Sequence, residues 1–249
     1  MEKTKKLALL VDGDNAQPKI LDLILEEASK YGKVTVRRIY GDWTTPQMNK
    51  WKGILNDIAF NPIQKFSYTT GKNSTDSALI IDAMDILHAA QVDGFCIVSS
   101  DSDYTGLAKR IREEGVFVMG IGEKKTPNAF VKSCEIFTFV ENLEVTEITE
   151  VPEAPKVTKG KPSKKAVEKS NKPTLDLKLL NKAFDMSANE SDEVNVSTLG
   201  FNLRKLDPSF DSRTYGYKSL THLLKNIKQF EMIDNIINGI NYHMLKRKA

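Results

Sequence analysis

Apolar runs and amphipathic stretches alternate from the N-terminus to about residue 140. Short apolar runs predict β-strands, whereas apolar residues spaced three and four apart predict helices. The predicted strands are Lys6–Val11, Val34–Tyr40, Ile63–Tyr68, Gly94–Val98, Val116–Ile121 and Glu135–Phe139. The predicted helices are Gln17–Lys30, Pro46–Phe60, Thr75–Ala90 and Tyr104–Glu114. This alternation indicates an α/β domain over residues 1–140, with a mainly parallel sheet between two helical layers.

A different pattern begins near residue 173 and continues to residue 249. The predicted elements there are helices at Leu175–Met186, Thr198–Leu206 and Tyr217–Asn226, a strand at Val194–Val196, and a hairpin of Phe230–Ile236 with Ile240–Leu245. The hairpin turn holds Asn238-Gly239, a favoured turn dipeptide. Three short helices closed by a hairpin predict a small winged helix-turn-helix domain. Residues 141–172 carry glutamates, then lysines and prolines, with few large apolar residues, which predicts a flexible linker.

Composition narrows the class of protein further. The 249 residues carry a net charge of +3, which excludes a uniformly basic protein, and 40% of them are hydrophobic. Cys96 and Cys134 lie in strand-like apolar runs, which predicts buried free thiols. No signal peptide is evident, and no stretch approaches the ~20 apolar residues of a membrane span. We expect a soluble cytoplasmic protein that has no membrane partner.

Aspartates follow the predicted strands at the places where ligands bind in parallel sheets. Asp12 comes directly after the first strand and Asp101 after the fourth, with Asp103 two residues later. Asp76 and Asp82 lie on the helix between them. Strand C-termini meet at one edge of such a sheet, and gathered carboxylates raise each other's pKa. Mg²⁺ or Mn²⁺ relieves that repulsion, so the pattern predicts a metal-dependent enzyme acting on phosphate esters.

Neighbouring polar residues could support these acids. Asn15 and Ser100 could hydrogen-bond the carboxylates or a phosphate group. Helix capping or a simple surface charge remains the alternative for Asp14, Asp82 and Asp103.

Three ordered motifs carry a resemblance to a known family. They are VDGDN at residues 11–15, KNSTDSALIIDAM at 72–84 and VSSDSDY at 98–104. Together they resemble the NYN domain, a PIN-like nuclease group that includes the LabA proteins. The resemblance implies a PIN-like, Rossmannoid three-layer fold. It also implies catalytic, metal-binding roles for four aspartates and supporting roles for two further residues: Asp12, Asp76, Asp101 and Asp103, then Asn15 and Asp82.

Two residues depart from the motif of that family. Ser100 stands where the family usually has glycine, and Tyr104 stands where it has phenylalanine. Both changes are mild, although a side chain at residue 100 could crowd an approaching phosphate.

The C-terminal segment from Asp207 to Lys225 resembles a LOTUS, or OST-HTH, domain. Its signature there is a proline, then Phe-Asp, then Tyr-Gly-Tyr before a helix with paired leucines. The resemblance implies RNA binding, and for some members protein partners. The candidate phosphate-binding residues are Arg204, Lys205, Arg213, Lys218 and Lys225. Tyr215 is a candidate for stacking on a base, with packing in the small core as its alternative.

Three functions compete at this point. The leading prediction is a metal-dependent ribonuclease that uses Mg²⁺ or Mn²⁺ and is targeted by its own RNA-binding domain. The alternative is an RNA-binding regulator with a weak or inactive acidic site. A phosphatase that forms an aspartyl-phosphate is the third, but Ala16 stands where that chemistry needs threonine or valine. A protein partner of the C-terminal domain and a homodimer both stay open.

Overall fold

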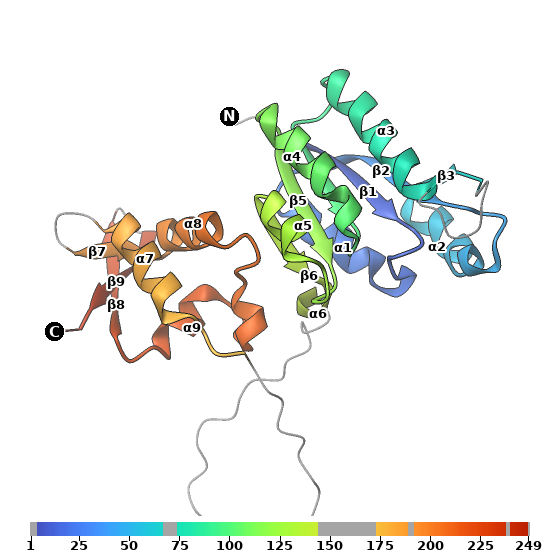
Figure 1. Cartoon of the computed structure of the whole chain (residues 1–249). Helices are drawn as coiled ribbons and strands as arrows, with labels where there is room; N and C mark the ends of the chain where they lie inside the picture. Colours follow the sequence, from blue (N-terminus) through green and yellow to red (C-terminus); the bar gives the residue numbers. More distant parts are fainter. Residues whose placement is uncertain (1–3, 67–73, 144–172, 189–191, 238–239, 249) are drawn as a thin grey trace, which may run out of the picture.

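Six parallel strands form the sheet of the N-terminal domain, in the order β3-β2-β1-β4-β5-β6 (Figure 1). The computed structural model describes residues 4–66, 74–143, 173–188, 192–237 and 240–248. The strands are β1 Lys6–Asp12, β2 Lys33–Gly41, β3 Asn61–Gln64, β4 Gly94–Val98, β5 Phe117–Gly122 and β6 Ile136–Phe139. The strand order reverses between β1 and β4, and open α/β sheets bind ligands at such a point.

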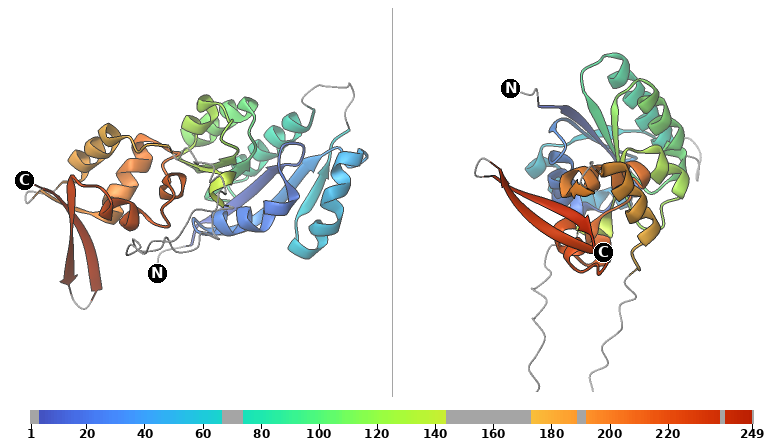
Figure 2. Two further views of the ribbon diagram at one scale, coloured as in Figure 1. Left: turned by 90° about the horizontal axis from the view of Figure 1, so that it is seen from below. Right: turned by 90° about the vertical axis from the view of Figure 1, so that its left-hand side faces the viewer.

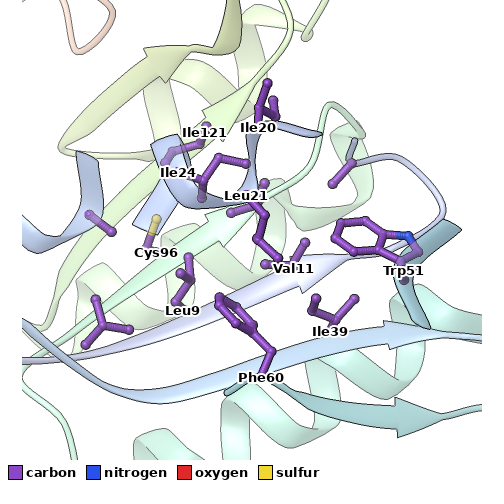
Figure 3. Close-up of a cluster of buried hydrophobic side chains, with 14 of the residues drawn as sticks. Leu9, Val11, Ile20, Leu21, Ile24, Ile39, Trp51, Phe60, Cys96 and Ile121 are labelled. Carbon is purple, nitrogen blue, oxygen red and sulfur yellow. The ribbon is translucent and has the colours of Figure 1, made fainter. Parts of the chain in front are cut away.

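Helices cover both faces of this sheet. Along β1, Leu7, Leu9 and Val11 enter one core, while Ala8 and Leu10 enter the other. The first core lies under α1 Leu21–Ser29 and α2 Asn49–Ile58, and Figure 3 shows it. The second lies under α3 Ser74–His88, α4 Thr105–Glu113 and α5 Asn128–Ser133. The predicted three-layer α/β fold is therefore confirmed.

Most element boundaries in the N-terminal domain differ from the predicted ones by one to four residues. Strand β3 starts two residues earlier than predicted and ends at Gln64, so Lys65 and Phe66 are not part of it; residues 67 and 68 of the predicted strand lie outside the described residues. The short helices α5 and α6 Val140–Leu143 were not predicted, because one or two turns give too little periodicity. Helix α6 includes the start of the predicted linker, and its Leu143 is buried in the first core. The rest of that linker, residues 144–172, lies outside the described residues.

The C-terminal domain is built from three helices and a three-stranded antiparallel sheet. The helices are α7 Leu177–Ser187, α8 Val196–Leu206 and α9 Leu220–Lys225. The sheet pairs β7 Glu193–Asn195 with β9 Ile240–Arg247, and β9 with β8 Phe230–Ile237. Its core includes Leu180, Phe184, Leu203, Leu224 and Phe230. The predicted helical domain with a hairpin is therefore confirmed, although the turn dipeptide itself lies outside the described residues.

Helix α9 is shorter than the predicted Tyr217–Asn226. The side chain of Ser219 accepts a hydrogen bond from the His222 amide and so caps the helix at Leu220. The preceding residues form a 3-10 turn, Ser212–Tyr215, that ends at Gly216 in the left-handed region with a φ of 83°. Glycine adopts that conformation without strain, so the chain can turn there.

Two predictions from composition can be compared with this fold. Cys96 and Cys134 are both buried free thiols, as predicted. Within the described part of the chain, none of the helices combines the length and the apolar character needed to cross a membrane.

Candidate metal centre

The turn after β1 fixes where Asp12 lies. The amide of Gly13 donates to the Tyr40 carbonyl oxygen at 2.9 Å, and the Trp51 indole donates to the Gly13 carbonyl at 3.1 Å. A Cβ at residue 13 would lie 2.7 Å from the Tyr40 oxygen, so the turn needs glycine. The chain therefore leaves the sheet edge directly after Asp12, whose side chain is 0% exposed.

Hydrogen bonds hold the Asp12 carboxylate in place. Its Oδ2 atom accepts from Asn15 Nδ2 at 2.7 Å and from Ser99 Oγ at 2.9 Å. Its Oδ1 atom accepts from the Asp14 amide at 3.2 Å. Ser99 Oγ also accepts from the Asp101 amide at 3.1 Å, which connects the ends of β1 and β4. Asn15, a predicted supporting residue, thus contacts the Asp12 carboxylate directly.

Three further carboxylates gather at the same edge. Asp76 lies in the first turn of α3, Asp101 follows β4, and Asp103 lies in the 3-10 turn Ser102–Tyr104. One oxygen from each of the three lies within 4.8 Å of the other two. Opposite oxygens around an octahedral Mg²⁺ lie about 4.2 Å apart, twice the usual Mg–O distance. The three aspartates therefore lie close enough together to be candidate oxygen ligands of one Mg²⁺ or Mn²⁺ ion.

Burial makes the negative charges at this edge costly. The pKa of Asp12 is raised, mainly by desolvation and also by the nearby Asp76 and Asp14. The pKa of Asp76 is raised too, by desolvation and by Asp101, Asp103 and Asp14. Within the described residues, neither Asp12 nor Asp76 forms an ion pair with lysine or arginine. A divalent cation would offset this repulsion directly.

Tyr104 is a further member of this site. Its hydroxyl donates to Asp76 Oδ1 at 2.6 Å, and its ring is fully buried against Phe130, with 6.2 Å between ring centroids. The pKa of Tyr104 is raised by desolvation and then by the negative charges of Asp12 and Asp76. The hydroxyl therefore lies beside both carboxylates. This hydrogen bond to Asp76 was not predicted from the sequence. The available signal was that Tyr104 stands where the family usually has phenylalanine.

Comparison with protein families agrees with this arrangement. The model named NYN domain matches residues 6–144, more than half of the chain. The chain belongs to the NYN family. A second model, the OST-HTH/LOTUS domain, matches residues 174–242. The acidic edge therefore lies in the NYN domain, and the three-helix unit is the OST-HTH domain.

Individual proteins add little to the family match. The search of curated proteins found no match. A crystal structure of a protein of unknown function, VPA0982 from Vibrio parahaemolyticus, is 20% identical with a TM-score of 0.48 and covers 56% of this chain and 95% of its own. A solution structure of an uncharacterized protein from gene locus NE0665 of Nitrosomonas europaea is 29% identical with a TM-score of 0.30. That match covers 39% of this chain and 93% of the other.

Two predicted supporting residues of the NYN domain have other partners. Asp82 accepts from the Arg38 guanidinium and from the Tyr40 hydroxyl, and it is absent from the three-aspartate group. This ion pair joins α3 to β2, so the geometry gives Asp82 a structural role in place of the predicted one. Ser100 Oγ accepts from the Glu123 amide at 2.9 Å and ties β4 to β5. Lys72 of the second motif lies outside the described residues.

The predicted RNA-binding residues of the OST-HTH domain separate into two sets. Four of them have exposed side chains: Arg204, Lys205, Lys218 and Lys225. Tyr215 instead packs against Phe210, with 6.0 Å between ring centroids, at the margin of the core. Arg213 binds Asp211 and Glu27, so it is already occupied by carboxylates. For Tyr215 and Arg213 the structure favours packing and ion pairing over the predicted RNA contacts.

Phe201 is an exposed aromatic residue that the sequence analysis did not single out as a candidate for ligand contact. It is 61% exposed on α8, and Lys205 Nζ lies 4.7 Å from the centroid of its ring. The available signal was its helical spacing, because Phe201 lies off the apolar stripe that includes Leu199 and Leu203.

Proposed function

We propose that this protein is a metal-dependent ribonuclease whose NYN domain hydrolyses RNA and whose OST-HTH domain binds it. The observation that supports this most directly is the convergence of Asp76, Asp101 and Asp103 beside the buried Asp12. A site of this kind favours a hard divalent cation over other ligands. The NYN family match and the OST-HTH match support the choice of a nuclease and of RNA.

The residues of the acidic edge divide into candidate metal ligands and residues that orient the carboxylates. Asp76, Asp101 and Asp103 would hold Mg²⁺ or Mn²⁺. When bound, such an ion supplies Lewis-acid polarisation of a phosphoryl oxygen and lowers the pKa of water. Asn15 and Ser99 keep Asp12 in one orientation, and Tyr104 does the same for Asp76.

The exposed face of α8 is the best candidate for RNA contact. The exposed residues of this helix are Ser197, Thr198, Phe201, Arg204 and Lys205. None of these five is acidic, and two carry positive charge. Phosphates can pair with Arg204 and Lys205, while Phe201 offers a flat surface for a base. Such a surface suits single-stranded RNA, because bases there are free to stack.

Cleavage assays with matched variants test this proposal. Labelled single-stranded and structured RNAs would be incubated with the purified protein and Mn²⁺, Mg²⁺ or EDTA. We expect cleavage that EDTA abolishes, and we expect Asp101→Asn and Asp103→Asn to lower it to the EDTA level. Asp57→Asn is the control, because Asp57 is an exposed residue of α2. Undiminished cleavage by both site variants would refute the assignment.

RNA binding without cleavage would support the alternative function, that of an RNA-binding regulator. If the wild-type protein binds RNA with both metals present but never cleaves it, the chain is an RNA-binding regulator. Isothermal titration with Mn²⁺ would then show whether the aspartates still hold a metal.

A further inference from the structure

The OST-HTH domain contacts the NYN domain along β6, the free edge of the six-stranded sheet. Figures 1 and 2 show the C-terminal domain beside β6 and α6. The Phe137 amide of β6 donates to the Pro208 carbonyl at 2.9 Å, and Asn142 Nδ2 donates to Thr214 Oγ1 at 2.8 Å. Asn142 is itself buried. The OST-HTH domain therefore satisfies a main-chain donor that an edge strand would otherwise expose.

An ion-pair network lies at the centre of this contact. Arg213 donates to both carboxylate oxygens of Glu27, at 3.0 and 2.9 Å. The same guanidinium donates to Asp211 Oδ2 at 2.6 Å, and Lys30 lies 2.8 Å from Glu27. The Glu27 side chain is 4% exposed and that of Arg213 is 19% exposed. Two-point pairing of this kind fixes the orientation of both side chains.

Glu27 depends on Arg213 for its charge. It lies on the buried stripe of α1 that also holds Leu21, Ile24 and Ala28. A carboxylate placed there is costly unless it is paired. The pKa of Glu27 is nevertheless lowered, because hydrogen bonds from Arg213 and Lys30 outweigh the desolvation that would raise it. The N-terminal domain thus carries a buried charge that the OST-HTH domain neutralises.

The docked position also orients the basic face of α8. Burial raises the pKa of Tyr31, which lies two residues after α1, and the nearby positive charge of Arg204 acts against that shift. Strand β6 is two strands away from β4, a lateral distance of about 10 Å at the usual strand spacing. Strand β1 has seven residues, so the sheet is about 20 Å long between the α1 end and the acidic edge. The exposed face of α8 near Tyr31 and the acids are therefore separated by about 20 Å along the strands and about 10 Å across them.

We propose that the Glu27–Arg213 contact holds the OST-HTH domain in one position, so that RNA is cut at a set distance from the segment this domain binds. The proposal rests on the ribonuclease function stated above. If the OST-HTH domain were tethered only by a linker, RNA would be cut at scattered positions, because the distance between the bound segment and the acids would vary. A docked domain leaves a constant number of nucleotides between its surface and the acids.

The docking of the OST-HTH domain on the NYN domain can be measured independently of RNA cleavage. Small-angle X-ray scattering of the full chain would compare the wild type with Glu27→Gln and Arg213→Met. We expect a larger maximum dimension in both variants. The triply substituted Glu27→Met/Asp211→Asn/Arg213→Met chain guards against a folding defect, because it removes the Arg213 cation together with both of its carboxylate partners. Arg247→Met is the control, since it removes an exposed ion pair with Asp185 inside the OST-HTH domain.

Cleavage positions then test the spacing. RNAs that carry one high-affinity segment at different places would be cut with Mn²⁺ and mapped at nucleotide resolution. The wild type and the control should cut at one distance from the segment, whereas the undocked variants should cut over a broad range. Unchanged scattering by both single variants, or unchanged cut positions in expanded variants, would overturn the proposal. If no form cleaves RNA, the nuclease function and the spacing fail together, and scattering still decides the docking.

Discussion

Two buried carboxylates of the NYN domain, Asp12 and Glu27, have opposite electrostatic surroundings. Both are almost fully buried, Asp12 with 0% and Glu27 with 3% of the residue exposed. Asp12 faces other aspartates, and its pKa is raised by desolvation and by those charges. Glu27 faces Arg213 and Lys30, and its pKa is lowered by them despite desolvation.

The difference separates a ligand site from a structural contact. The protein itself supplies the cations at Glu27, so that carboxylate stabilises the fold as it stands. Within the described residues no lysine or arginine pairs with Asp12 or Asp76, so the acidic edge calls for a cation from solution. Burial alone would not have distinguished the two.

The largest effect is expected from neutralising Glu27. Glu27→Gln removes a buried charge that Arg213 needs, and truncating one partner of such a pair costs about 2–5 kcal/mol. Urea unfolding of the full chain would measure the loss. Glu26→Gln is the matched control, because Glu26 is exposed on the same helix. Equal stabilities of the two variants would show that the contact contributes nothing.

A smaller effect is expected from Tyr104→Phe, which removes only the hydroxyl beside Asp76. Groups that orient metal ligands typically contribute 10–100-fold to metal affinity, and we expect a loss in that range. Titration calorimetry with Mn²⁺ would measure it in the absence of RNA. Tyr242→Phe is the control, because Tyr242 is an exposed residue of β9 in the other domain. An unchanged Mn²⁺ affinity would mean that the hydroxyl only fills space.

Acidification should progressively weaken the Glu27–Arg213 ion pair. The pKa of Glu27 in the fold lies below its ordinary 4.5, so its contribution is complete above pH 4.5 and is lost as the pH falls through the lowered value. The stability difference between wild type and Glu27→Gln should therefore shrink on going from pH 6 to below pH 4.5. Unfolding curves at several pH values would measure it. A difference that grows on acidification would contradict the assigned pairing.

The smallest effect, and the opposite sign, is expected for Asp76→Asn without metal. The pKa of Asp76 is raised above 3.8, so ionisation in the fold is unfavourable and its cost is complete only above the raised value. Neutralising it should leave the metal-free protein as stable at pH 7 or slightly more stable. The thermal shift that Mn²⁺ causes should disappear in the same variant. A clear loss of stability in the metal-free protein would show that the Asp76 carboxylate stabilises the fold, as that of Glu27 does.

Much of the acidic edge was predictable from local sequence. An apolar run followed at once by Asp12 or Asp101 specifies both a buried strand and the position of a carboxylate at its end. Because parallel strands end at a common edge, those two aspartates were expected to lie close together. Asp82 was harder to place, because six residues after Asp76 bring it to another part of the helix surface. There it meets Arg38 and Tyr40 of β2.

What the sequence determined by itself was the order of the elements, the two domains and the aspartates at the strand ends. These depend on residues that are close along the chain or on motifs that can be read in one stretch. The tertiary structure alone decided that Arg213 pairs with Glu27, which lies 186 residues away. It also decided that the Tyr104 hydroxyl reaches Asp76 and that Phe201 is exposed. The charge and hydrogen-bonding capacity of these residues are local properties, but their partners are set by how distant elements pack.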